Sequence, residues 1–296
     1  MTAQIIDGKQ VAADMRAEFK EDVAKLKKKG IVPGLAVILV GEDPASISYV
    51  TSKERDCEDT GIYSDDNRLP TDTKQKELIA LIEEKNNDPK INGILVQLPL
   101  PKHLNEAEVL LAIDPAKDVD GFHPVNTGKM MIGEKAFLPC TPHGIVQLLI
   151  RNNVTIEGAD VVIVGRSNLV GKPLANMLIQ KKTNANATVT VCHTRTKNLA
   201  SHTKRADIIV AAVGRANTVT ADMVRDGAVV IDVGVNRVED ATKKRGYRLV
   251  GDVDFEAVKE KASLITPVPG GVGPMTRTML LYNTIESAKI AAGLSV

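Results

Sequence analysis

The sequence contains no tryptophan, and aromatic residues make up only 3% of its 296 residues. Few side chains are therefore available to stack on the bases of a single-stranded nucleic acid. Lysine and arginine number 38 against 37 aspartates and glutamates, which gives a formal net charge of +1. Because nucleic-acid-binding proteins usually carry a basic excess, this balance argues against that class and leaves room only for a local anion site.

Long hydrophobic runs and paired cysteines are also missing. No segment approaches the roughly 20 apolar residues that span a membrane, and the first residues, MTAQIIDGKQ, have neither a basic start nor an apolar core. The 3 cysteines are far apart and form no CxxC pair, which argues against a disulfide framework or a zinc site. We therefore expect a cytoplasmic protein without a bound metal.

Short apolar runs alternate with amphipathic segments of helical length in the first part of the chain. The pattern predicts strands at 34–40 and 91–101, and helices at 44–61, 73–86 and 106–113. Strands that alternate with helices favour a parallel sheet covered by helices.

A loop-rich segment, residues 114–144, separates this part from a second alternating unit, and a helix at 143–153 is expected to lead into it. The other expected strands are 160–165, 187–192, 206–214 and 227–234, and the other expected helices are 172–182, 198–205 and 275–293. This rhythm is typical of a doubly wound nucleotide-binding domain. A Pro/Gly-rich loop, residues 266–276, precedes the last helix, which is long enough to reach back to the first domain.

The turn GRSNLVGKP, residues 165–173, follows the first strand of the second unit. A glycine turn that opens a helix can bind a phosphate through its free backbone N–H groups and the positive end of the helix dipole. The turn does not match GxGxxG, so an ordinary connection between strand and helix remains the alternative.

The residues after the next strand bear on the choice of nucleotide. An NAD-binding enzyme places a carboxylate there, on the ribose hydroxyls, but this sequence has His193, Thr194 and Arg195, with Arg166 in the first turn. Two arginines and a hydroxyl suit a 2′-phosphate, so we expect NADP rather than NAD. The alternative is that both arginines are ordinary solvated charges.

Tyr49 and Lys53 lie one helical turn apart on the expected helix 44–61, at the flank of its apolar stripe. Partial dehydration at such an edge lowers the pKa of a lysine, which allows it to act as a general base or to deliver a proton near neutral pH. The alternative is a surface lysine whose aliphatic stem covers apolar neighbours.

Other polar residues follow the carboxyl ends of the expected strands, where ligands bind in parallel sheets. Gln97 stands at the end of one strand, and Asp120 precedes flexible Gly121 in a loop on the same side. A carboxylate at this place can accept paired hydrogen bonds from a heterocycle. The alternative for Asp118 and Asp120 is turn capping, and we expect His123 to hydrogen-bond within the loop rather than to bind a metal.

A series of motifs occurs in order along the chain: YVTSK with the following DTGI, GILVQLPLP, KDVDGFHPVNTGK, CTPHG, GRSNLVGKP and PVPGGVGPMT. Together they resemble the bifunctional methylenetetrahydrofolate dehydrogenase/methenyltetrahydrofolate cyclohydrolase (FolD) family over residues 5–290. The resemblance implies NADP-dependent oxidation of 5,10-methylenetetrahydrofolate and hydrolysis of the methenyl product to 10-formyltetrahydrofolate. It further implies a cytoplasmic homodimer in one-carbon metabolism, tetrahydrofolate interconversion, and purine and amino-acid biosynthesis.

The fold that the resemblance implies has two α/β domains with a cleft between them. The second is a Rossmann-like NADP-binding domain, and the C-terminal helix packs back on the first. The expected boundaries assign residues 1–141 and 275–296 to a catalytic folate-binding domain and residues 142–274 to the NADP-binding domain.

The resemblance also assigns roles to residues. The expected catalytic residues are Tyr49, Lys53, Gln97 and Asp120, and the expected substrate-binding set consists of Tyr49, Lys53, Gln97, Leu98, Asp120, Pro269, Gly270 and Gly273. The expected cofactor-binding residues are Gly165, Arg166, Ser167, His193, Thr194, Arg195, Val235 and Thr276. Thr194 replaces a serine of the family and keeps its hydroxyl, and Val235 replaces the usual isoleucine. Lys53 is the expected proton-transfer group of the cyclohydrolase step.

Two alternatives fit the same fold. A monofunctional dehydrogenase would not need Lys53, because hydride transfer requires no such base. A sensor that binds NADP(H) and a partner protein without chemistry would not need the four polar residues of the first domain. A formyltetrahydrofolate ligase is excluded, since the chain has no GxxxxGK[ST] phosphate loop.

Overall fold

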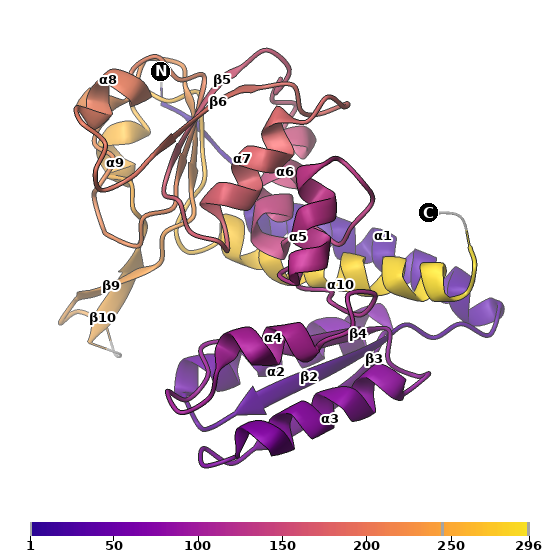
Figure 1. Ribbon diagram of the computed structural model, residues 1–296. Coiled ribbons are helices and arrows are strands. Elements are labelled where there is room, and N and C mark those ends of the chain that lie inside the picture. Colours follow the sequence, from indigo (N-terminus) through magenta and orange to yellow (C-terminus); the bar gives the residue numbers. More distant parts are fainter. Residues whose placement is uncertain (1, 244–245, 295–296) are drawn as a thin grey trace. The chain divides into compact units, whose positions relative to one another are not determined.

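The computed structural model describes residues 2–243 and 246–294, so residues 1 and 296, the outer limits of the predicted domains, lie outside the described part. The chain forms two compact units (Figure 1). The six-stranded unit comprises the residues up to Ala12 together with Thr141–Thr276, and the three-stranded unit comprises Ala13–Cys140 together with the residues from Arg277 onward. Within the described ranges, no helix combines the length and apolar character needed to cross a membrane.

The six-stranded unit is built on a parallel sheet with the strand order β1-β11-β8-β7-β5-β6. Its strands are β1 (Gln4–Ile5), β5 (Asp160–Val164), β6 (Thr188–Cys192), β7 (Ile208–Ala211), β8 (Val229–Asp232) and β11 (Leu264–Ile265). The helical segments are α6 (Cys140–Arg151), α7 (Gly171–Ile179), α8 (Leu199–Thr203), the 3-10 turn η1 (Ala221–Met223) and α9 (Phe255–Val258). Every residue of β7 and β8 is buried, as is usual in a parallel sheet covered on both faces.

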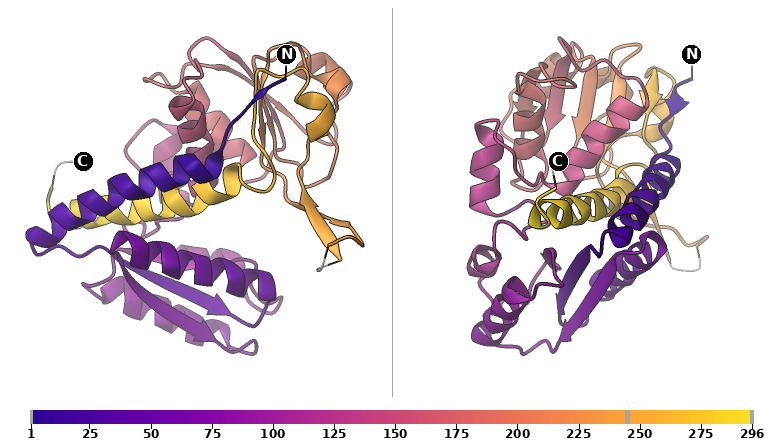
Figure 2. Two further views of the ribbon diagram at one scale, coloured as in Figure 1. Left: turned by 180° about the vertical axis from the view of Figure 1, so that it is seen from behind. Right: turned by 90° about the vertical axis from the view of Figure 1, so that its right-hand side faces the viewer.

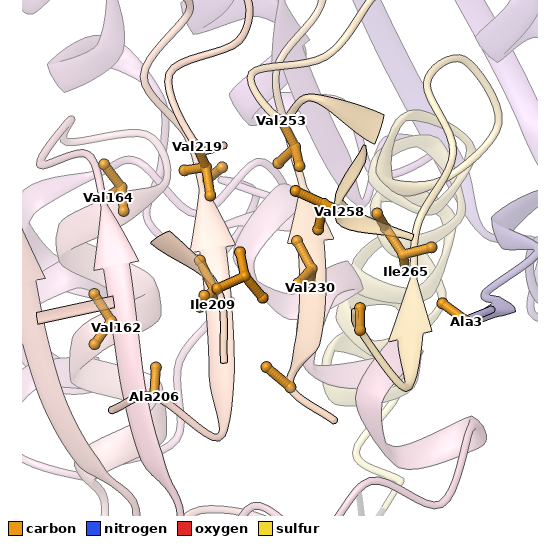
Figure 3. Close-up of a cluster of buried hydrophobic side chains, with 14 of the residues drawn as sticks. Ala3, Val162, Val164, Ala206, Ile209, Val219, Val230, Val253, Val258 and Ile265 are labelled. Carbon is orange, nitrogen blue, oxygen red and sulfur yellow. The ribbon is translucent and has the colours of Figure 1, made fainter. Parts of the chain in front are cut away.

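One face of this sheet packs into a core of small aliphatic side chains (Figure 3). Val162 of β5, Ile209 of β7 and Val230 of β8 are neighbours in the parallel register and point to the same side. Branched side chains are stiff and pack well on a pleated surface. The strands are therefore firmly held up to their carboxyl ends, from which the loops of the candidate nucleotide site emerge.

A separate antiparallel pair, β9 (Asn236–Glu239) with β10 (Tyr247–Val250), follows β8 in the chain (Figure 1). The guanidinium of Arg237 lies 5.0 Å from the centre of the Tyr247 ring. This cation–π contact supports a pair of strands that no third strand joins among the described residues.

The three-stranded unit has a parallel sheet with the order β3-β2-β4. Its strands are β2 (Gly34–Val40), β3 (Tyr63–Leu69) and β4 (Gly93–Val96), and its helices are α2 (Pro44–Thr60), α3 (Gln75–Asn87), α4 (Glu106–Ala112) and α5 (Pro124–Met131). Side chains of α3 and α4 form a core with one face of the sheet. The right-handed crossovers through α2 and α3 step in opposite directions, which places α2 on the other face (Figures 1 and 2).

The boundaries of α2 follow from its sequence. The Asp43 carboxylate accepts a hydrogen bond from Ser46 N at 2.8 Å, and Pro44 occupies the first helical turn, as is typical of helix starts. Gly61 ends the helix with φ 82°, a conformation that favours glycine. These two signals fix which side chains of α2 share a face.

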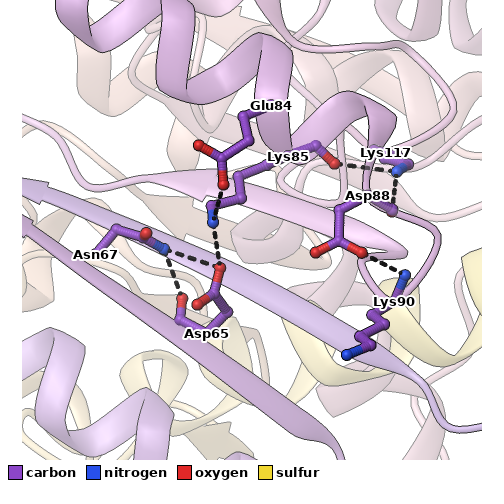
Figure 4. Close-up of polar contacts among 7 residues, drawn as sticks. All are labelled: Asp65, Asn67, Glu84, Lys85, Asp88, Lys90 and Lys117. Carbon is purple, nitrogen blue, oxygen red and sulfur yellow. Dashed lines mark hydrogen bonds and ion pairs between the residues drawn. The ribbon is translucent and has the colours of Figure 1, made fainter.

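Strand β3 is polar because it lies at the edge of its sheet and is anchored by ion pairs (Figure 4). The Lys85 ammonium of α3 lies 3.0 Å from the Asp65 carboxylate of β3 and 2.9 Å from that of Glu84. Lys117 donates to the Lys85 and Asp88 carbonyls at 3.1 and 2.9 Å, which ties the end of α3 to the loop between α4 and α5.

The last helix, α10 (Val272–Ala291), packs on the three-stranded unit as predicted. The Asn283 amide donates to the Val119 and Leu138 carbonyls at 2.8 and 3.0 Å. Its neighbour in that unit is α1 (Gly8–Lys28), whose Phe19 ring lies 5.9 Å from the Tyr282 ring (Figure 2). The polar residues of α10 thus satisfy loop carbonyls that would otherwise be buried without partners.

Two sequence predictions need correction. The segment 114–144, predicted to be irregular, contains α5, because the His123 side chain caps it by accepting from Val125 N at 3.1 Å and Pro124 begins it. Residues 2–12, predicted in the first domain, group with the six-stranded unit, since β1 pairs in parallel with β11. The sequence patterns also gave no prediction for α1, β3 or the β9–β10 pair.

Candidate active site

Lys53 and Tyr49 lie on one face of α2, with the Lys53 ammonium 5.5 Å from the centre of the Tyr49 ring. Lys53 is only 7% exposed, whereas the Tyr49 side chain is 42% exposed. Burial lowers the pKa of Lys53, and the negative charge of Asp120 opposes this effect in part. A surface lysine with a fully hydrated ammonium, the alternative considered above, does not describe this side chain.

Gln97 follows β4 and is oriented by two hydrogen bonds. Its amide nitrogen donates to the Leu98 carbonyl at 2.6 Å, so its oxygen faces Lys53 and accepts from the Lys53 ammonium at 3.0 Å. The strand end itself is fixed, because Gln97 N donates to the Ile38 carbonyl of β2 at 2.8 Å. Gln97 is therefore a preorganised acceptor for the amine.

Asp120 lies near Lys53, in the loop before α5. Burial raises the pKa of its carboxyl to about 6, and the Lys53 charge opposes the rise. The neighbouring Asp118 has a different environment, because its carboxylate accepts from His123 N at 2.8 Å and from the Asn126 amide at 2.9 Å. Asp118 therefore serves the turn, and Asp120 is left to face the amine.

The sequence patterns did not single out Asp56 and Arg277, two charged residues that belong to the same cluster as Lys53, Gln97 and Asp120. Asp56 continues the face of α2 that carries Tyr49 and Lys53, and its carboxylate lies 3.2 Å from the Arg277 guanidinium of α10. The sequence contains one feature that could have revealed Asp56. Positions 49, 53 and 56 follow the i, i+4, i+7 spacing of a single helical face. An aspartate in an amphipathic helix looks like a solvated charge, yet Asp56 is 6% exposed.

The other predicted substrate residues fall in two places. Leu98 is next to Gln97, whereas Pro269, Gly270 and Gly273 belong to the six-stranded unit. Gly270 has φ 111°, and an added Cβ would lie 3.2 Å from the Lys9 side chain. Gly273 lies in the first turn of α10 with no close neighbour.

A surface depression beside α2 faces away from the Lys53 side of the helix. It is lined by Thr51, Glu54, Arg55, Glu58, Ser64 and Asp66. Its acidic lining suits neither an anionic substrate nor a proton-transfer step that uses Lys53, so we place the candidate site on the other face of the helix.

In the six-stranded unit, glycines shape the turn between β5 and α7. Gly165 has φ 136°, and an added Cβ would lie 2.1 Å from the Ala212 carbonyl oxygen. At Gly171, an added Cβ would lie 2.1 Å from the Gly165 carbonyl oxygen. Only glycine allows this turn to close so tightly before the amino end of α7, where free N–H groups favour an anion.

The predicted cofactor residues next to this turn are exposed. Arg166, Ser167, Thr194 and Arg195 lie at the surface. The turns that carry them are adjacent, because Val164 and Cys192 pair at the ends of β5 and β6. Ser167 Oγ accepts from Val170 N at 3.1 Å, and His193 Nδ1 accepts from Arg195 N at 3.1 Å.

Two buried aspartates, also missed from the sequence, organise the next loops along this edge. The Asp252 carboxylate accepts from Val213 N and Gly214 N, at 2.6 and 2.9 Å, after β7. The Asp232 carboxylate accepts from Gly234 N at 3.0 Å and from Val253 N at 2.9 Å, and burial raises its pKa to about 6. Val235, which follows, is 64% exposed.

Thr276, the last predicted cofactor residue, lies in the first half of α10. Its hydroxyl is 2.9 Å from that of Thr141, and both residues belong to the six-stranded unit. The hydroxyl can donate to a ligand while it accepts from Thr141, or the reverse.

A parallel sheet with a glycine-shaped turn before a helix, together with a second α/β unit that holds a buried lysine, defines a two-domain nucleotide-dependent enzyme. Two family models match the chain. Residues 6–120 match the catalytic domain of tetrahydrofolate dehydrogenase/cyclohydrolase, and residues 139–292 match its NAD(P)-binding domain.

Curated relatives match over nearly the whole chain. The bifunctional protein FolD of Syntrophus aciditrophicus is 58% identical over 294 residues, covering 99% of this chain and 100% of the relative. The bifunctional protein FolD of Bacillus subtilis is 56% identical over 289 residues, covering 98% and 99%.

Solved structures agree. The bifunctional FolD enzyme of Campylobacter jejuni superposes with a TM-score of 0.92 at 50% identity, covering 97% of this chain and 99% of that chain. A FolD structure from Trypanosoma brucei, complexed with NADP cofactor and inhibitor, gives a TM-score of 0.92 at 38% identity, covering 99% of both chains. The chain therefore belongs to the tetrahydrofolate dehydrogenase/cyclohydrolase family, as a bifunctional, NADP-dependent enzyme that acts on folate derivatives.

Proposed function

We propose that Lys53 transfers the proton in the cyclohydrolase step, with Gln97 and Tyr49 holding its amine. The observation that carries this role is the buried Lys53 ammonium, 3.0 Å from the Gln97 oxygen. Because burial lowers its pKa, more of the amine is neutral near pH 7 than in an ordinary lysine. A neutral amine can take the proton from the water that adds to the methenyl carbon. The resulting ammonium can then protonate the ring nitrogen as its bond to that carbon breaks, while the hydroxyl proton of the adduct passes to solvent and the formyl C=O forms, which yields 10-formyltetrahydrofolate.

We propose that Asp120 binds the pterin ring of the folate. An ionised carboxylate accepts two hydrogen bonds from neighbouring N–H donors of a heterocycle. The loop supports this role, because Asp118 takes the turn-forming hydrogen bonds, whereas the Asp120 carboxyl faces Lys53 and the Cys140 thiol. Leu98, Pro269, Gly270 and Gly273 complete the proposed substrate-binding set.

We propose that NADP binds along the carboxyl edge of the six-stranded sheet. The residues present fit it: the tight Gly165 turn precedes a helix, and Arg166 and Arg195 are exposed on adjacent turns. Arg166, Thr194 and Arg195 would hold the 2′-phosphate, with Ser167 and His193 beside them. Val235 and Thr276 complete the proposed set. When bound, NADP⁺ supplies the hydride acceptor for oxidation of the methylene bridge.

The dehydrogenase step needs positioning more than acid–base chemistry. The folate nitrogens stabilise the cation that remains after hydride loss, so the chain has to orient the two rings and exclude water. A monofunctional dehydrogenase remains the second candidate, and it is favoured only if Lys53 proves idle.

We also propose that the protein is a cytoplasmic homodimer that supplies one-carbon units to purine and amino-acid biosynthesis. The edge strand β3 supports self-association, because it pairs only with β2 among the described strands. In the same described part, the buried Ser64 hydroxyl of β3 has no hydrogen-bond partner. Light scattering on the purified protein tests this assembly, and a monomer at micromolar concentration would contradict it.

The function is tested by supplying 5,10-methylenetetrahydrofolate with NADP⁺ in one reaction and NAD⁺ in another. Nicotinamide reduction and methenyl absorbance are followed together. We expect faster reduction of NADP⁺ and little accumulation of the methenyl compound. Accumulation of the methenyl compound would leave a monofunctional dehydrogenase, and equal rates with both nucleotides would remove the role of the arginines.

A further inference from the structure

A buried cluster of three charged side chains lies behind Lys53. The Asp56 carboxylate of α2 is 3.2 Å from the Arg277 guanidinium of α10 and 4.0 Å from that of Arg16 in α1. Arg16 also donates to the Thr278 hydroxyl at 3.1 Å. The side chains of Arg16 and Arg277 are 23% and 24% exposed, so water screens them only in part.

The cluster is next to the proposed catalytic residues because of helical geometry. Tyr49, Lys53 and Asp56 share one face of α2, so a group bound to Asp56 is held within about one turn of Lys53. Two guanidinium groups share one carboxylate, and the cluster therefore retains positive charge when Asp56 is ionised. Burial raises the pKa of Asp56, and Arg277 and then Arg16 oppose this rise.

We propose that Arg277, held in place by Asp56, is a positioning residue for proton transfer at Lys53, where it supplies a fixed positive charge. This inference rests on the proposed role of Lys53 in the cyclohydrolase step. A positive charge fixed near an amine favours its neutral form, and the neutral form is the proton acceptor in that step. The same charge would also polarise the phenol of Tyr49.

The electrostatics around Lys53 support a distinct part for Arg277. The charged or titratable groups that act on Lys53 are Asp120 of the loop before α5, Cys140 at the start of α6, Arg277 of α10 and Cys57 of α2. After burial, which lowers the pKa of Lys53 most, Asp120, Cys140 and Cys57 raise it and Arg277 lowers it. Arg277 also lowers the pKa of Tyr49, against the larger effect of burial. Arg16, which shares the same carboxylate, is not among the largest influences on the pKa of Lys53.

The experiment measures the Lys53 titration directly by NMR of protein labelled with [6-¹³C]lysine. The Lys53 resonance is identified by its loss in Lys53→Met. In Arg277→Met we expect the Lys53 pKa to rise by about 0.5 to 1 unit, the size of a nearby charge effect in a partly screened site. The acidic limb of the cyclohydrolase pH profile should move upward by the same amount. Arg277→Lys, which keeps the charge, should restore both values.

Arg16→Met is the matched control, because it removes the other arginine from the same carboxylate. It should leave the Lys53 titration unchanged. Asp56→Asn removes the negative charge, but the asparagine oxygen can still accept from the Arg277 guanidinium and hold it, so this variant should not raise the Lys53 pKa. A purely structural role for the cluster predicts the same shift in all three variants, and that result would overturn the inference.

The outcomes separate this inference from the proposed function. If Lys53→Met abolishes cyclohydrolase activity and Arg277→Met leaves both the titration and the pH profile unchanged, the positioning role is wrong and the role of Lys53 stands. If Lys53→Met retains full cyclohydrolase activity, the proposed role of Lys53 fails, and a shifted titration in Arg277→Met would then report a field without a catalytic use.

Discussion

Lys53 of the three-stranded unit is 7% exposed, whereas in the six-stranded unit Val235, after β8, is 64% exposed and Arg166, after β5, lies at the surface. The polar groups of the first region are side chains that contact one another. Those of the second region are mainly backbone groups, placed by Gly165, Gly171 and two buried aspartates. The proposed proton transfer and the proposed nucleotide binding would therefore depend on different parts of the chain.

The difference follows from the two tasks. Burial lowers the pKa of a lysine before the substrate arrives only if water is already excluded, so the surroundings of Lys53 must be buried in the free protein. A dinucleotide is large and charged, and an exposed edge with backbone N–H groups and arginines can bind it as it displaces water. Substitutions in the first region should thus affect proton transfer or folate binding, and those in the second should affect nucleotide binding.

Lys53→Met should have the largest effect, because it removes the proposed proton-transfer group and nearly preserves the volume of the side chain. Cyclohydrolase turnover should fall by about 100- to 10,000-fold, with dehydrogenase activity and NADP⁺ affinity retained. The fold should persist, since burial lowers the pKa of Lys53 and the charged amine costs stability near neutral pH. Thermal unfolding of the variant should occur at the same or a higher temperature than that of the wild type. Unchanged cyclohydrolase turnover would contradict the proton-transfer role of Lys53.

Gly165→Ala should damage the nucleotide region through its backbone. The added methyl would lie 2.1 Å from the Ala212 carbonyl oxygen at φ 136°, so the turn must open at a cost of about 2–4 kcal/mol. NADP⁺ binding measured by calorimetry should be lost or strongly weakened.

The matched control is Gly158→Ala, at φ 74° with no atom near the added methyl. This variant should lose only about 1 kcal/mol, from left-handed backbone strain, and should bind NADP⁺ normally. Equal losses in the two variants would mean that the close approach to Ala212 is not what requires glycine at position 165.

Arg166→Ala should reduce NADP⁺ affinity about 10- to 100-fold, which is the strength of one or two charge-assisted hydrogen bonds. The affinity for NAD⁺, which lacks the 2′-phosphate, should change little. Arg205→Ala is the control, because Arg205 precedes β7 at the opposite end of the strands and donates to the Thr190 hydroxyl at 3.2 Å. Equal losses for both nucleotides in Arg166→Ala would show that this arginine does not contact the 2′-phosphate.

The sequence predicted elements whose signals are local. Strand β2 is an uninterrupted apolar run, and α2 is bounded by Pro44 and Gly61, so both were predicted within a residue of their observed limits. The polar strand β3 was missed, because its partners for Asp65 come from α3 and no alternation of apolar residues reveals an edge strand.

The same distinction, between local signals and contacts that form only in the folded chain, holds for the residues of the two sites. The pairing of Lys53 with Gln97 could be anticipated, since one follows β2 on a helix and the other ends the neighbouring strand β4. The contact of Asp56 with Arg277 could not, because the two residues are distant in the chain and meet only after α10 packs on α2. Asp232 looked like the last residue of a strand, and only the folded loops show that it accepts backbone N–H groups.

Asp120→Asn should have the smallest effect and the most specific pH dependence. Burial raises the pKa of Asp120 to about 6, with Lys53 opposing the rise, so the carboxylate is ionised above that pH and protonated below it. If the ionised form binds the pterin, affinity for folic acid should weaken as the pH falls from 7.5 to 5, by about tenfold for each pH unit below the pKa. In Asp120→Asn the affinity should be about tenfold weaker at pH 7.5, because an acceptor is replaced by a donor, and it should no longer depend on pH in this range. Calorimetric titration with folic acid measures both, with NADP⁺ binding to the same samples as the internal control. If Asp120→Asn keeps the wild-type pH dependence, another group is responsible for the titration and Asp120 does not bind the pterin.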